Sequence, residues 1–502
     1  MTDSCKIRAI QGFSNEARKL SSNAEHQTES TLLVKLVQAS QVRLFHTPEQ
    51  VAYAELNLNG LRKSVRVRSK AFQDWLARRY YYEYQKAPRA QALQVALGVV
   101  EGMALFEGGE YPIYVRLAES EGRVYLDLGR PDGAVVEVSP NSWQVIVESP
   151  VRFRRPHNML PLPLPERGGR VDALQSVLNL APEDWPLVAA WLVAALNPNG
   201  PYPLLFVQGE QGTGKSSLAW MLKDLVDPST GSLRAHPREV RDLMLAAANS
   251  WVLSFDNLSS LPVWLSDGLC RLSTGGSFAT RTLYHDDEES VLNAARPVIL
   301  TGIEELATRG DLLDRAVLLY LPPIEATKQR PYRQICAQYE ELRPYVLGAL
   351  LDAVSQALQR LPHLKLEQLP RMADFTTWVV AASPGLGLDP ETFLKAYHNN
   401  REITHELVLE GLPIVLALQA LLESQPVWEG TVTELHQTLA SHLTFKSFKV
   451  QQRYHWPMNP RGLSNALRRL APNLRSAGIN VHFYRTNQAR LIRIEIISRN
   501  SC

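Results

Sequence analysis

A glycine-rich loop between an apolar run and a helix-like segment constrains this chain more than any other feature. In "LLFVQGEQGTGKSSLAWMLKDL", residues 204–225, the spacing is G-x-x-x-x-G-K-S. The run 204–207 is typical of a short buried strand, and apolar residues recur at helical spacing from Leu218 to Leu225. Such a loop wraps its backbone N–H groups around phosphate oxygens, which favours glycine because a Cβ would obstruct the approach. The helix start adds unpaired N–H groups and the positive end of its dipole.

The sequence therefore predicts an ATP-binding loop of nine consecutive residues. They are Gly209, Glu210, Gln211, Gly212, Thr213, Gly214, Lys215, Ser216 and Ser217. We expect Lys215 to reach the outer phosphates and the Ser216 hydroxyl to bind Mg²⁺. The expected cofactors are thus ATP and Mg²⁺.

Two further apolar strands end in polar residues that fit the same chemistry. "WVLSFDN" places Asp256 at the C-terminal end of a buried strand, where its carboxylate can hold Mg²⁺. The next residue is Asn257, whose amide can orient an attacking water but cannot accept its proton. Either another carboxylate assists, or hydrolysis is slow. "RPVILTG" ends at Thr301, which is either a sensor of the γ-phosphate or a capping threonine.

Two arginines precede the next apolar strand. The segment "TRGDLLDRAVLLYLP" contains Arg309 and Arg315. An arginine supplied by a neighbouring subunit can stabilise the charge that develops on a transferred phosphoryl group. The alternative for each is an ion pair within the domain, with Asp311 or Asp314 as partner.

The segment between the second and third strands is predicted to form a β-hairpin. In residues 274–295, apolar and polar side chains alternate, an acidic turn follows, and the chain then returns. In a ring-shaped assembly such a hairpin can project into the central channel, where Arg281 would meet a nucleic-acid backbone. The alternative is a packed surface hairpin.

The composition fits a globular protein without membrane segments, with 45% hydrophobic and 21% charged residues among 502. The four cysteines, at positions 5, 270, 336 and 502, lack metal-binding spacing, so we expect a reducing compartment and no structural zinc. The apolar run "WPLVAAWLVAAL" from Trp185 is too short to span a bilayer and is predicted as a buried helix. The polar N-terminus has no signal-peptide core. These features predict a cytoplasmic location and no membrane partner.

Positive charge is concentrated near both ends of the chain. Residues 61–90 contain nine basic and two acidic residues, and residues 444–502 contain eleven basic residues and one acidic residue. Such segments predict a polyanionic partner, most simply DNA. A solvated basic face is the alternative for each.

Five segments are predicted along the chain. They are a polar flexible tail (1–30), an N-terminal α+β domain (31–165), a P-loop core (166–330), a helical region (331–405) and a C-terminal domain (406–502). The N-terminal domain contains a predicted hairpin that turns at 131–133. Asp127 lies in this hairpin without a second carboxylate in D-x-D spacing, so we predict a hairpin carboxylate and no nucleotidyl transferase.

The C-terminal domain is predicted to be a winged helix. Residues 431–443 and 459–478 have helical patterns, the second interrupted near Pro472, and 479–497 resemble a hairpin turning at 487–488. In a winged helix the second of these helices enters the major groove of duplex DNA and the hairpin touches the backbone. The residues expected to face DNA are Arg461, Arg468, Arg469, Arg485 and Arg490. A protein-interaction module is the alternative.

The order of four segments resembles a known family. "GEQGTGKSS", "WVLSFDN", "GGSFATRTLYHDDEE" and "RPVILTGIEELATRGDLLDR" follow one another within about 110 residues. This order resembles the superfamily 3 AAA+ helicases, specifically the poxvirus-type primase-helicase group of phages and mobile genetic elements. The resemblance implies an α/β P-loop AAA+ core in a hexameric ring that moves along one DNA strand. It also implies that Lys215 and Ser216 are Walker A residues, Asp256 and Asn257 the Walker B pair, Thr301 the polar residue of motif C, and Arg315 the arginine finger.

Three functions follow from these patterns. The first is an ATP-driven DNA helicase or translocase that acts as a hexameric ring on single-stranded DNA during replication of a mobile element. The second is an ATP-switched initiator or regulator that binds DNA and hydrolyses ATP slowly, which Asn257 favours. The third is an AAA+ protein remodeller, which would not need the basic C-terminus.

Overall fold

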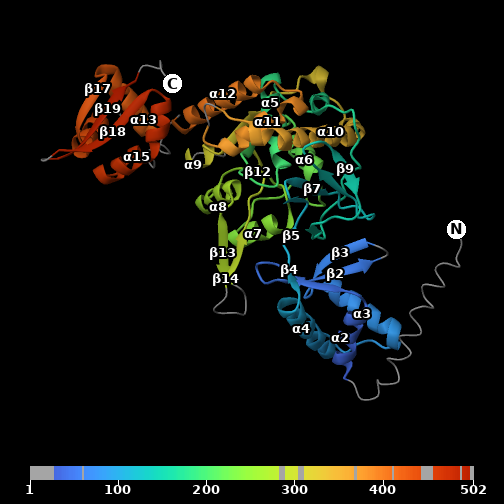
Figure 1. The fold of residues 1–502 in the computed structure, drawn as a ribbon. Helices are drawn as coiled ribbons and strands as arrows, with labels where there is room; N and C mark the ends of the chain where they lie inside the picture. The colour runs from blue at the N-terminus through green and yellow to red at the C-terminus, as the bar shows by residue number, and fades with distance from the viewer. Residues whose placement is uncertain are drawn as a thin grey trace. The chain divides into compact units, whose positions relative to one another are not determined.

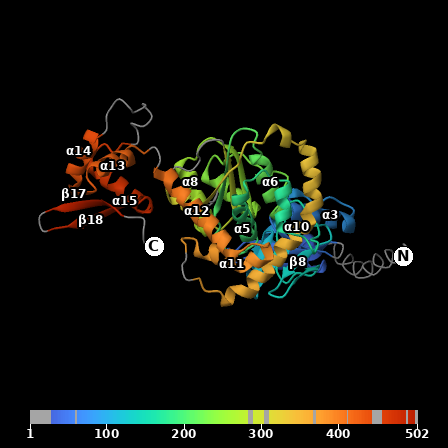
Figure 2. The same ribbon diagram turned by 90° about the horizontal axis from the view of Figure 1, so that it is seen from above.

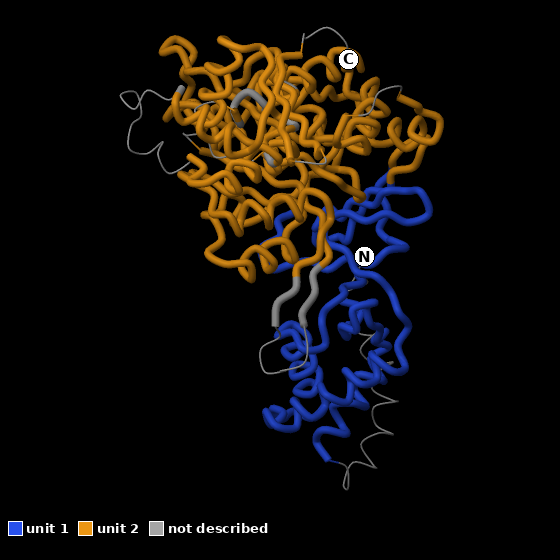
Figure 3. Tube along the Cα trace, turned by 90° about the vertical axis from the view of Figure 1, so that its left-hand side faces the viewer, with its two compact units in different colours: residues 1–137, 144–161 blue, residues 138–143, 162–502 orange. Residues whose placement is uncertain are grey.

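The computed structural model describes residues 28–58, 61–281, 289–302, 310–366, 370–409, 412–442, 456–486 and 489–497. The chain divides into two compact units, which are residues 1–137 with 144–161 and residues 138–143 with 162–502 (Figure 3). The P-loop core, the helical region and the C-terminal segment therefore belong to one unit. Among the described residues, no helix is long and apolar enough to cross a membrane.

The first unit begins with a sheet covered by three helices (Figure 1). The strand order is β3-β2-β1-β4. The strands are β1 (Arg43–His46), β2 (Ala52–Leu58), β3 (Leu61–Arg66) and β4 (Gly109–Glu110). The helices are α2 (Glu29–Ala39), α3 (Lys70–Tyr84) and α4 (Ala90–Phe106). Alternate strand residues such as Ala54 and Val65 pack with Leu33, Leu76 and Leu97 into one core.

The first described helix corrects one sequence boundary. Residues 29 and 30 were predicted as part of the flexible tail, but they form the start of α2. The hydroxyl of Thr28 accepts a hydrogen bond from the Thr31 N–H, which caps the helix. Residues 1–27 of the predicted tail lie outside the described residues.

A second sheet, most of whose residues belong to the first unit, contains the predicted hairpin. Its order is β6-β7-β8-β9, with β6 (Leu117–Ser120), β7 (Arg123–Asp127), β8 (Val135–Val138) and β9 (Trp143–Ile146). β5 (Ile113–Tyr114) pairs in parallel with β10 (Arg152–Phe153). The turn between β7 and β8 includes Gly133, whose φ is 78°. A positive φ of this kind favours glycine.

Asp127 is the centre of a buried polar network. Its side chain is fully buried, and the Arg155 guanidinium binds both carboxylate oxygens, at 2.7 and 2.9 Å. The Gly129 N–H also donates to this carboxylate, and the buried Arg116 donates to the Asp127 backbone carbonyl. Both carboxylate oxygens of Asp127 are therefore bound by other groups of the protein, which agrees with the prediction of a hairpin carboxylate.

The second unit is built on a four-stranded parallel sheet. The strands are β11 (Leu204–Gln208), β12 (Leu253–Leu258), β15 (Val298–Gly302) and β16 (Ala316–Tyr320), in the order β12-β15-β11-β16. Arg234 adds a single parallel bridge to Phe255 of β12. Because β15 lies between β11 and β12, the carboxyl ends of these three strands meet at one edge of the sheet. The predicted α/β core with a parallel sheet is confirmed.

Helices cover both faces of this sheet (Figure 2). Phe206, Phe255 and Leu300 pack with α7 (Val240–Asn249) and α8 (Val263–Thr274). The helix that follows the glycine-rich loop, α6 (Lys215–Val226), contacts β11, β12 and β15. All residues of α5 (Trp185–Ala195) are buried, as the apolar run predicts. The remaining elements here are η2 (Val171–Ser176), η3 (Pro182–Asp184), β13 (Ser277–Arg281), β14 (Glu289–Asn293), α9 (Gly310–Leu313) and η4 (Ala326–Lys328).

A buried ion pair joins the end of α6 to the start of β12. The Lys223 ammonium donates to the backbone carbonyls of Asp227 and Val252, at 2.8 and 2.9 Å, and lies 3.3 Å from the Asp227 carboxylate. That carboxylate also accepts the N–H groups of Trp251 and Val252. Both charged side chains are almost fully buried, so each depends on the other for charge compensation.

Three helices form the region predicted as helical. They are α10 (Tyr332–Arg360), α11 (Ala373–Leu386) and α12 (Pro390–Leu409), with the short η5 (Leu361–His363) after α10. Arg343 of α10 forms an ion pair with Asp224 of α6 at 2.9 Å. The side-chain amide of Asn400 in α12 hydrogen-bonds both the N–H and the carbonyl of Leu318 in β16. α12 is therefore fastened to the outermost strand of the sheet.

The C-terminal region has one strand more than the sequence predicts. Its elements are α13 (Pro413–Ser424), β17 (Val427–Thr431), α14 (Val432–His442), α15 (Pro460–Ser476), β18 (Ile479–Arg485) and β19 (Arg490–Ile496). The sheet order is β17-β19-β18. The predicted helix, helix and hairpin are present in this order, and the predicted turn at 487–488 lies outside the described residues. The winged-helix assignment stays a prediction.

Two boundaries differ from the sequence interpretation. The predicted boundary at 405/406 falls inside α12, because no glycine or proline interrupts residues 391–409. α15 continues through Pro472, where an interruption was predicted. Leu467 and Leu474 are buried on either side of it. Their packing offsets a proline cost of about 3 kcal/mol.

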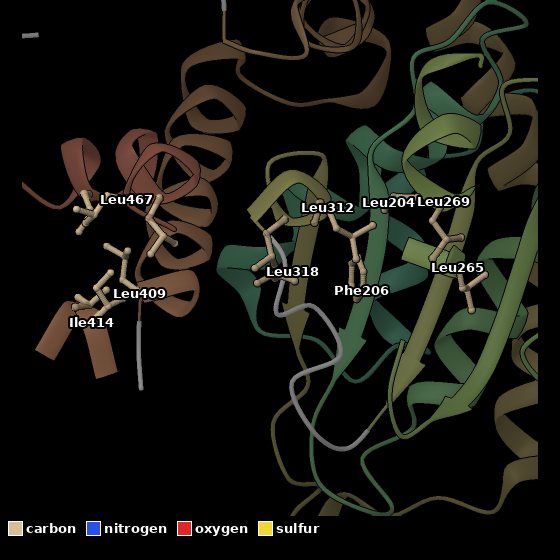
Figure 4. Close-up of a cluster of buried hydrophobic side chains, with 14 of the residues drawn as sticks. Leu204, Phe206, Leu265, Leu269, Leu312, Leu318, Leu409, Ile414 and Leu467 are labelled. Carbon is tan, nitrogen blue, oxygen red and sulfur yellow. The ribbon is translucent and has the colours of Figure 1, made fainter. Parts of the chain in front are cut away.

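The buried side chains of the second unit form an extended cluster (Figure 4). It includes Leu204 and Phe206 of the sheet and Leu265 and Leu269 of α8. It also includes Leu409, Ile414 and Leu467 from α12, α13 and α15. α12 contacts both β16 and α15, which explains how residues on either side of 406 share one compact unit.

We expect Asp127→Ala to destabilise the first unit by about 3 kcal/mol, because it leaves the Arg155 guanidinium without its buried carboxylate. The measurement is hydrogen exchange in peptides from β7 and β8 of the full chain. Asp132→Ala is the control, since its exposed pair with Arg130 is worth about 1 kcal/mol or less. Equal loss of protection in the two variants would contradict the prediction.

Candidate functional site

The predicted phosphate loop connects β11 to α6 at the carboxyl ends of the parallel strands. The φ angles of Gly209, Gly212 and Gly214 are 142°, 84° and 88°. L-residues with a Cβ seldom adopt such values. At Gly209 a Cβ would also lie 2.8 Å from the Leu321 carbonyl oxygen. Backbone conformation therefore explains glycine at all three positions. At Gly209 there is also too little space for a Cβ.

The other loop residues differ in exposure. The side chains of Glu210 and Gln211 are exposed, Ser217 is half-buried, and Thr213 is buried with its hydroxyl donating to the Glu210 carbonyl. The first turn of α6 leaves its N–H groups without partners in the helix. The loop therefore offers backbone donors on a rigid support, which suits an anionic ligand.

The Lys215 ammonium is held within the loop. It donates to the carbonyl oxygens of Gly209 and Glu210, at 2.8 and 2.6 Å. Burial lowers the pKa of Lys215, and the negative charge of Asp256 opposes this shift. A phosphate entering the loop would offer this ammonium charged oxygens in place of neutral carbonyls, which gives stronger hydrogen bonds.

Ser216, Asp256 and Thr301 form one hydrogen-bonded group. The Ser216 hydroxyl lies 2.9 and 3.0 Å from the two carboxylate oxygens of Asp256. The Thr301 hydroxyl donates to the same carboxylate and accepts the Asn257 N–H. Three different elements, α6, β12 and β15, thus bring the predicted residues together. Ser216 and Asp256 supply hard oxygen ligands side by side, which fits Mg²⁺.

Asn257 has an unusual backbone conformation. Its φ is 55°, and the pairing of β12 with β15 shifts between Phe255 and Leu258. Asn tolerates this left-handed region better than most residues with a Cβ. Its side chain is exposed. The irregularity explains in structural terms why an asparagine is well suited to this position.

One residue of the site has no signal in the sequence. The side-chain amide of Asn179 donates to the Thr213 carbonyl at 3.0 Å and to the Pro322 carbonyl at 2.7 Å. It therefore joins the glycine-rich loop to the segment that follows β16. No local pattern marks this asparagine, because its partners are distant in sequence.

Arg315 lies at the opposite end of the sheet from the loop of its own chain. β16 begins directly after it and pairs in parallel with β11, from Leu204↔Ala316 to Gln208↔Tyr320. Five strand residues span roughly 15 Å, which is more than an arginine side chain reaches. The Arg315 guanidinium donates to the Asp311 backbone carbonyl. Asp314, the other predicted partner, forms an ion pair with Arg371 instead. Arg309 lies outside the described residues.

The residues predicted to contact DNA are spread over two regions. β13 and β14 form the predicted hairpin, with Arg281 opposite Glu289, and its tip lies outside the described residues. In α15, Arg461 is exposed, and the Arg468 guanidinium lies 3.9 Å from the centre of the Phe483 ring. Arg469 belongs to the same helix. Arg485 and Arg490 are exposed and directly opposite each other in the β18–β19 pair.

Sequence comparison adds a biological setting. Residues 171–402 match the family described as "Actinomycete integrative conjugative element replication protein". Residues 414–501 match the family described as "AICE RepA C-terminal domain". The two matches together cover more than half of the chain.

The chain is related to the replication proteins of integrative conjugative elements. The first match includes the phosphate loop, Asp256, Thr301 and Arg315, and the second includes β17 to β19. A role in DNA replication of a mobile element follows from this relationship. No curated protein matches the chain.

Two solved structures illustrate the structural comparisons. The apo structure of the NrS-1 C-terminal region shares 10% identity at a TM-score of 0.41, over 94% of this chain and 100% of that one. The "SCCmec type IV Cch - active helicase" shares 13% identity at a TM-score of 0.44, over 91% of this chain and 93% of that one. At these values neither similarity bears on the site.

We expect Thr301→Val to lower ATP turnover about tenfold or more, because the Asp256 carboxylate loses one of its donors and the Asn257 N–H loses its acceptor. Thr301→Ser keeps the hydroxyl and should retain most of the turnover. The measurement is phosphate release at saturating ATP and Mg²⁺. Similar turnover in the two variants would show that the hydroxyl has no part in the reaction.

Proposed function

We propose that this chain is an ATP hydrolase: an ATP-driven DNA helicase or translocase that acts as a hexameric ring on single-stranded DNA during replication of its element. The observation that carries the proposal is the contact of Ser216 and Thr301 with Asp256 beside the glycine-rich loop. It supports a Mg²⁺–nucleotide site at the carboxyl edge of a parallel sheet, where such sheets bind ligands.

The residues of the site have separate roles in this proposal. The N–H groups of the loop and of the first turn of α6 bind phosphate oxygens. Ser216 and Asp256 would hold Mg²⁺, which when bound neutralises charge on the outer phosphates. Lys215 exchanges its backbone carbonyl partners for those phosphates. Thr301 fixes the orientation of the Asp256 carboxylate through its hydrogen bond.

The position of Arg315 supports action between subunits. Because it lies at the amino end of β16, it cannot reach the phosphates bound by its own chain. A neighbouring copy in a ring could place it there, where an arginine stabilises the charge of the transition state. A ring also gives the hairpin β13–β14 and its Arg281 a central channel in which to meet a DNA strand.

Asn257 favours a second candidate function. The side chain next to Asp256 is an amide, which cannot accept a proton from water. If no other carboxylate accepts this proton, ATP hydrolysis would be slow and bound ATP would act as a switch. The chain would then be an initiator or regulator whose ATP-bound form assembles on duplex DNA through Arg461, Arg485 and Arg490.

A mixture of two inactive variants should recover ATP turnover. We expect Lys215→Ala and Arg315→Ala each to lower turnover by roughly 10³-fold. Mixed subunits should restore a measurable part of it, because an intact Lys215 then meets an intact Arg315 from a neighbour. Arg333→Ala, which changes an exposed arginine of α10, is the control and should stay active. A mixture no more active than its components would exclude an arginine shared between subunits.

Single-stranded DNA should increase ATP turnover of the unaltered chain, whereas duplex DNA should have little effect. A translocating ring couples hydrolysis to a strand in its channel, which is the physical reason for this difference. The measurement compares turnover without DNA and with each DNA form. Slow turnover that is indifferent to DNA, together with tight ATP-dependent binding of duplex DNA, would favour the initiator.

A further inference from the structure

The N-terminal unit presents two exposed tyrosines on one helix. α3 buries Phe72, Leu76 and Tyr80 in the core of this unit. Tyr81 and Tyr82 lie away from that apolar stripe and are 52% and 62% exposed. Their ring centroids are 6.2 Å apart at an interplanar angle of 69°. Two aromatic rings are thus available to a ligand from solvent.

Exposed positive charge lies close in sequence to these rings. The Arg78 guanidinium lies 5.3 Å from the centre of the Tyr82 ring, and Arg79 and Lys86 are exposed nearby in sequence. The acids of this helix are Asp74 and Glu83. Within the described part of the unit, neither they nor other carboxylates lie within ion-pair distance of Arg78, Arg79 or Lys86.

Three other arginines of the same basic segment have carboxylate partners. Arg62 pairs with Glu55, Arg68 with Glu101, and Arg89 with Glu29. The net charge of residues 61–90 is therefore not spread evenly over the unit. Arg78, Arg79 and Lys86 remain near the C-terminal end of α3, close in sequence to the two tyrosines, whereas the exposed Lys63, Arg66 and Lys70 lie in β3 or at the start of α3.

We propose that this face of α3, defined by Arg78, Arg79, Tyr81 and Tyr82, binds single-stranded DNA. Cations attract the phosphates, and aromatic faces stack on bases without regard to sequence. Only a single strand leaves its bases free to stack, so the rings select it over a duplex. The site is independent of the ATP chemistry and gives the N-terminal unit a role in holding the strand.

The test measures DNA affinity of the full chain without nucleotide, using a labelled thymidine oligomer of roughly 20 nucleotides. Tyr81→Ala with Tyr82→Ala should weaken binding about tenfold or more, and the corresponding Phe variants should retain it. Arg78→Gln with Arg79→Gln should weaken binding and lower the slope of log K against log salt by about 1. The matched control is Arg68→Gln with Arg89→Gln, whose guanidinium groups are already paired. Tyr332→Ala, at a 58% exposed tyrosine elsewhere, controls for loss of an aromatic ring.

A second readout locates the contact. Photocrosslinking to an oligomer that contains iododeoxyuridine should label the peptide that includes Tyr81 and Tyr82. Unchanged affinity in both double variants would overturn the proposal, as would an equal loss for single-stranded and duplex DNA. A changed oligomeric state with unchanged DNA affinity would assign the face to a protein contact instead.

The outcome is separable from that of the proposed function. ATP turnover without DNA should be the same in the α3 variants as in the unaltered chain. If DNA fails to stimulate turnover but the α3 variants lose binding, the motor is wrong and this site stands. If DNA stimulates turnover and the α3 variants bind DNA normally, the motor is supported and the proposed site on α3 is wrong.

Discussion

The buried ion pair between Lys223 and Asp227 sets the geometry on which the candidate site at the glycine-rich loop depends. α6 and β12 run in opposite directions, and polar side chains connect them at both ends of the helix. At one, Lys223 and Asp227 fasten the end of the helix to Trp251 and Val252. At the other, Ser216 meets Asp256. Because a buried charge without its partner is very unfavourable, the first junction tolerates little sliding. It thereby determines which residue of β12 stands opposite the start of α6. Arg343 of α10 also binds Asp224 of α6. Asn179, in the segment before α5, binds the Thr213 carbonyl of the glycine-rich loop.

Much of the site could be predicted because it depends on short-range patterns. The glycine spacing, the apolar run before it and the amphipathic helix after it are all local, and they identify residues 209–217. Asp256 and Thr301 were found because each ends a strongly apolar strand, and parallel strands bring their carboxyl ends to one edge. The same reasoning applies to Arg315: a residue just before a parallel strand must lie at the far end from the loop. The sequence contains this information, but it becomes usable only once the strand is known to pair beside β11.

Residues that act through distant partners left no such pattern. Asn179, Asn400 and Lys223 are ordinary polar residues in sequence, and their importance arises from backbone groups more than 20 positions away. β17 was missed because five residues with one buried side chain make too short a pattern. Pro472 was given too much weight, since the burial of Leu467 and Leu474 outweighs the preference of proline for a helix end. Asp127 lies in the hairpin as predicted, yet its partner Arg155 follows three further strands and could not be inferred. In each case tertiary contacts decide what local preference leaves open.

The amide of Asn400 has a consequence for how copies of this chain can associate. β16 is the outermost strand of its sheet, and an outermost strand normally offers free N–H and carbonyl groups to any extended peptide. Here the central groups, those of Leu318, are already bound, and the helix that carries the amide lies along the strand. A second chain could not add a strand to this side without displacing α12. Assembly by continuous sheet, and the uncontrolled polymerisation that accompanies it, is therefore disfavoured on this side. Copies that associate on this side of the sheet must therefore do so through side-chain surfaces, which can separate and rejoin as ligands change.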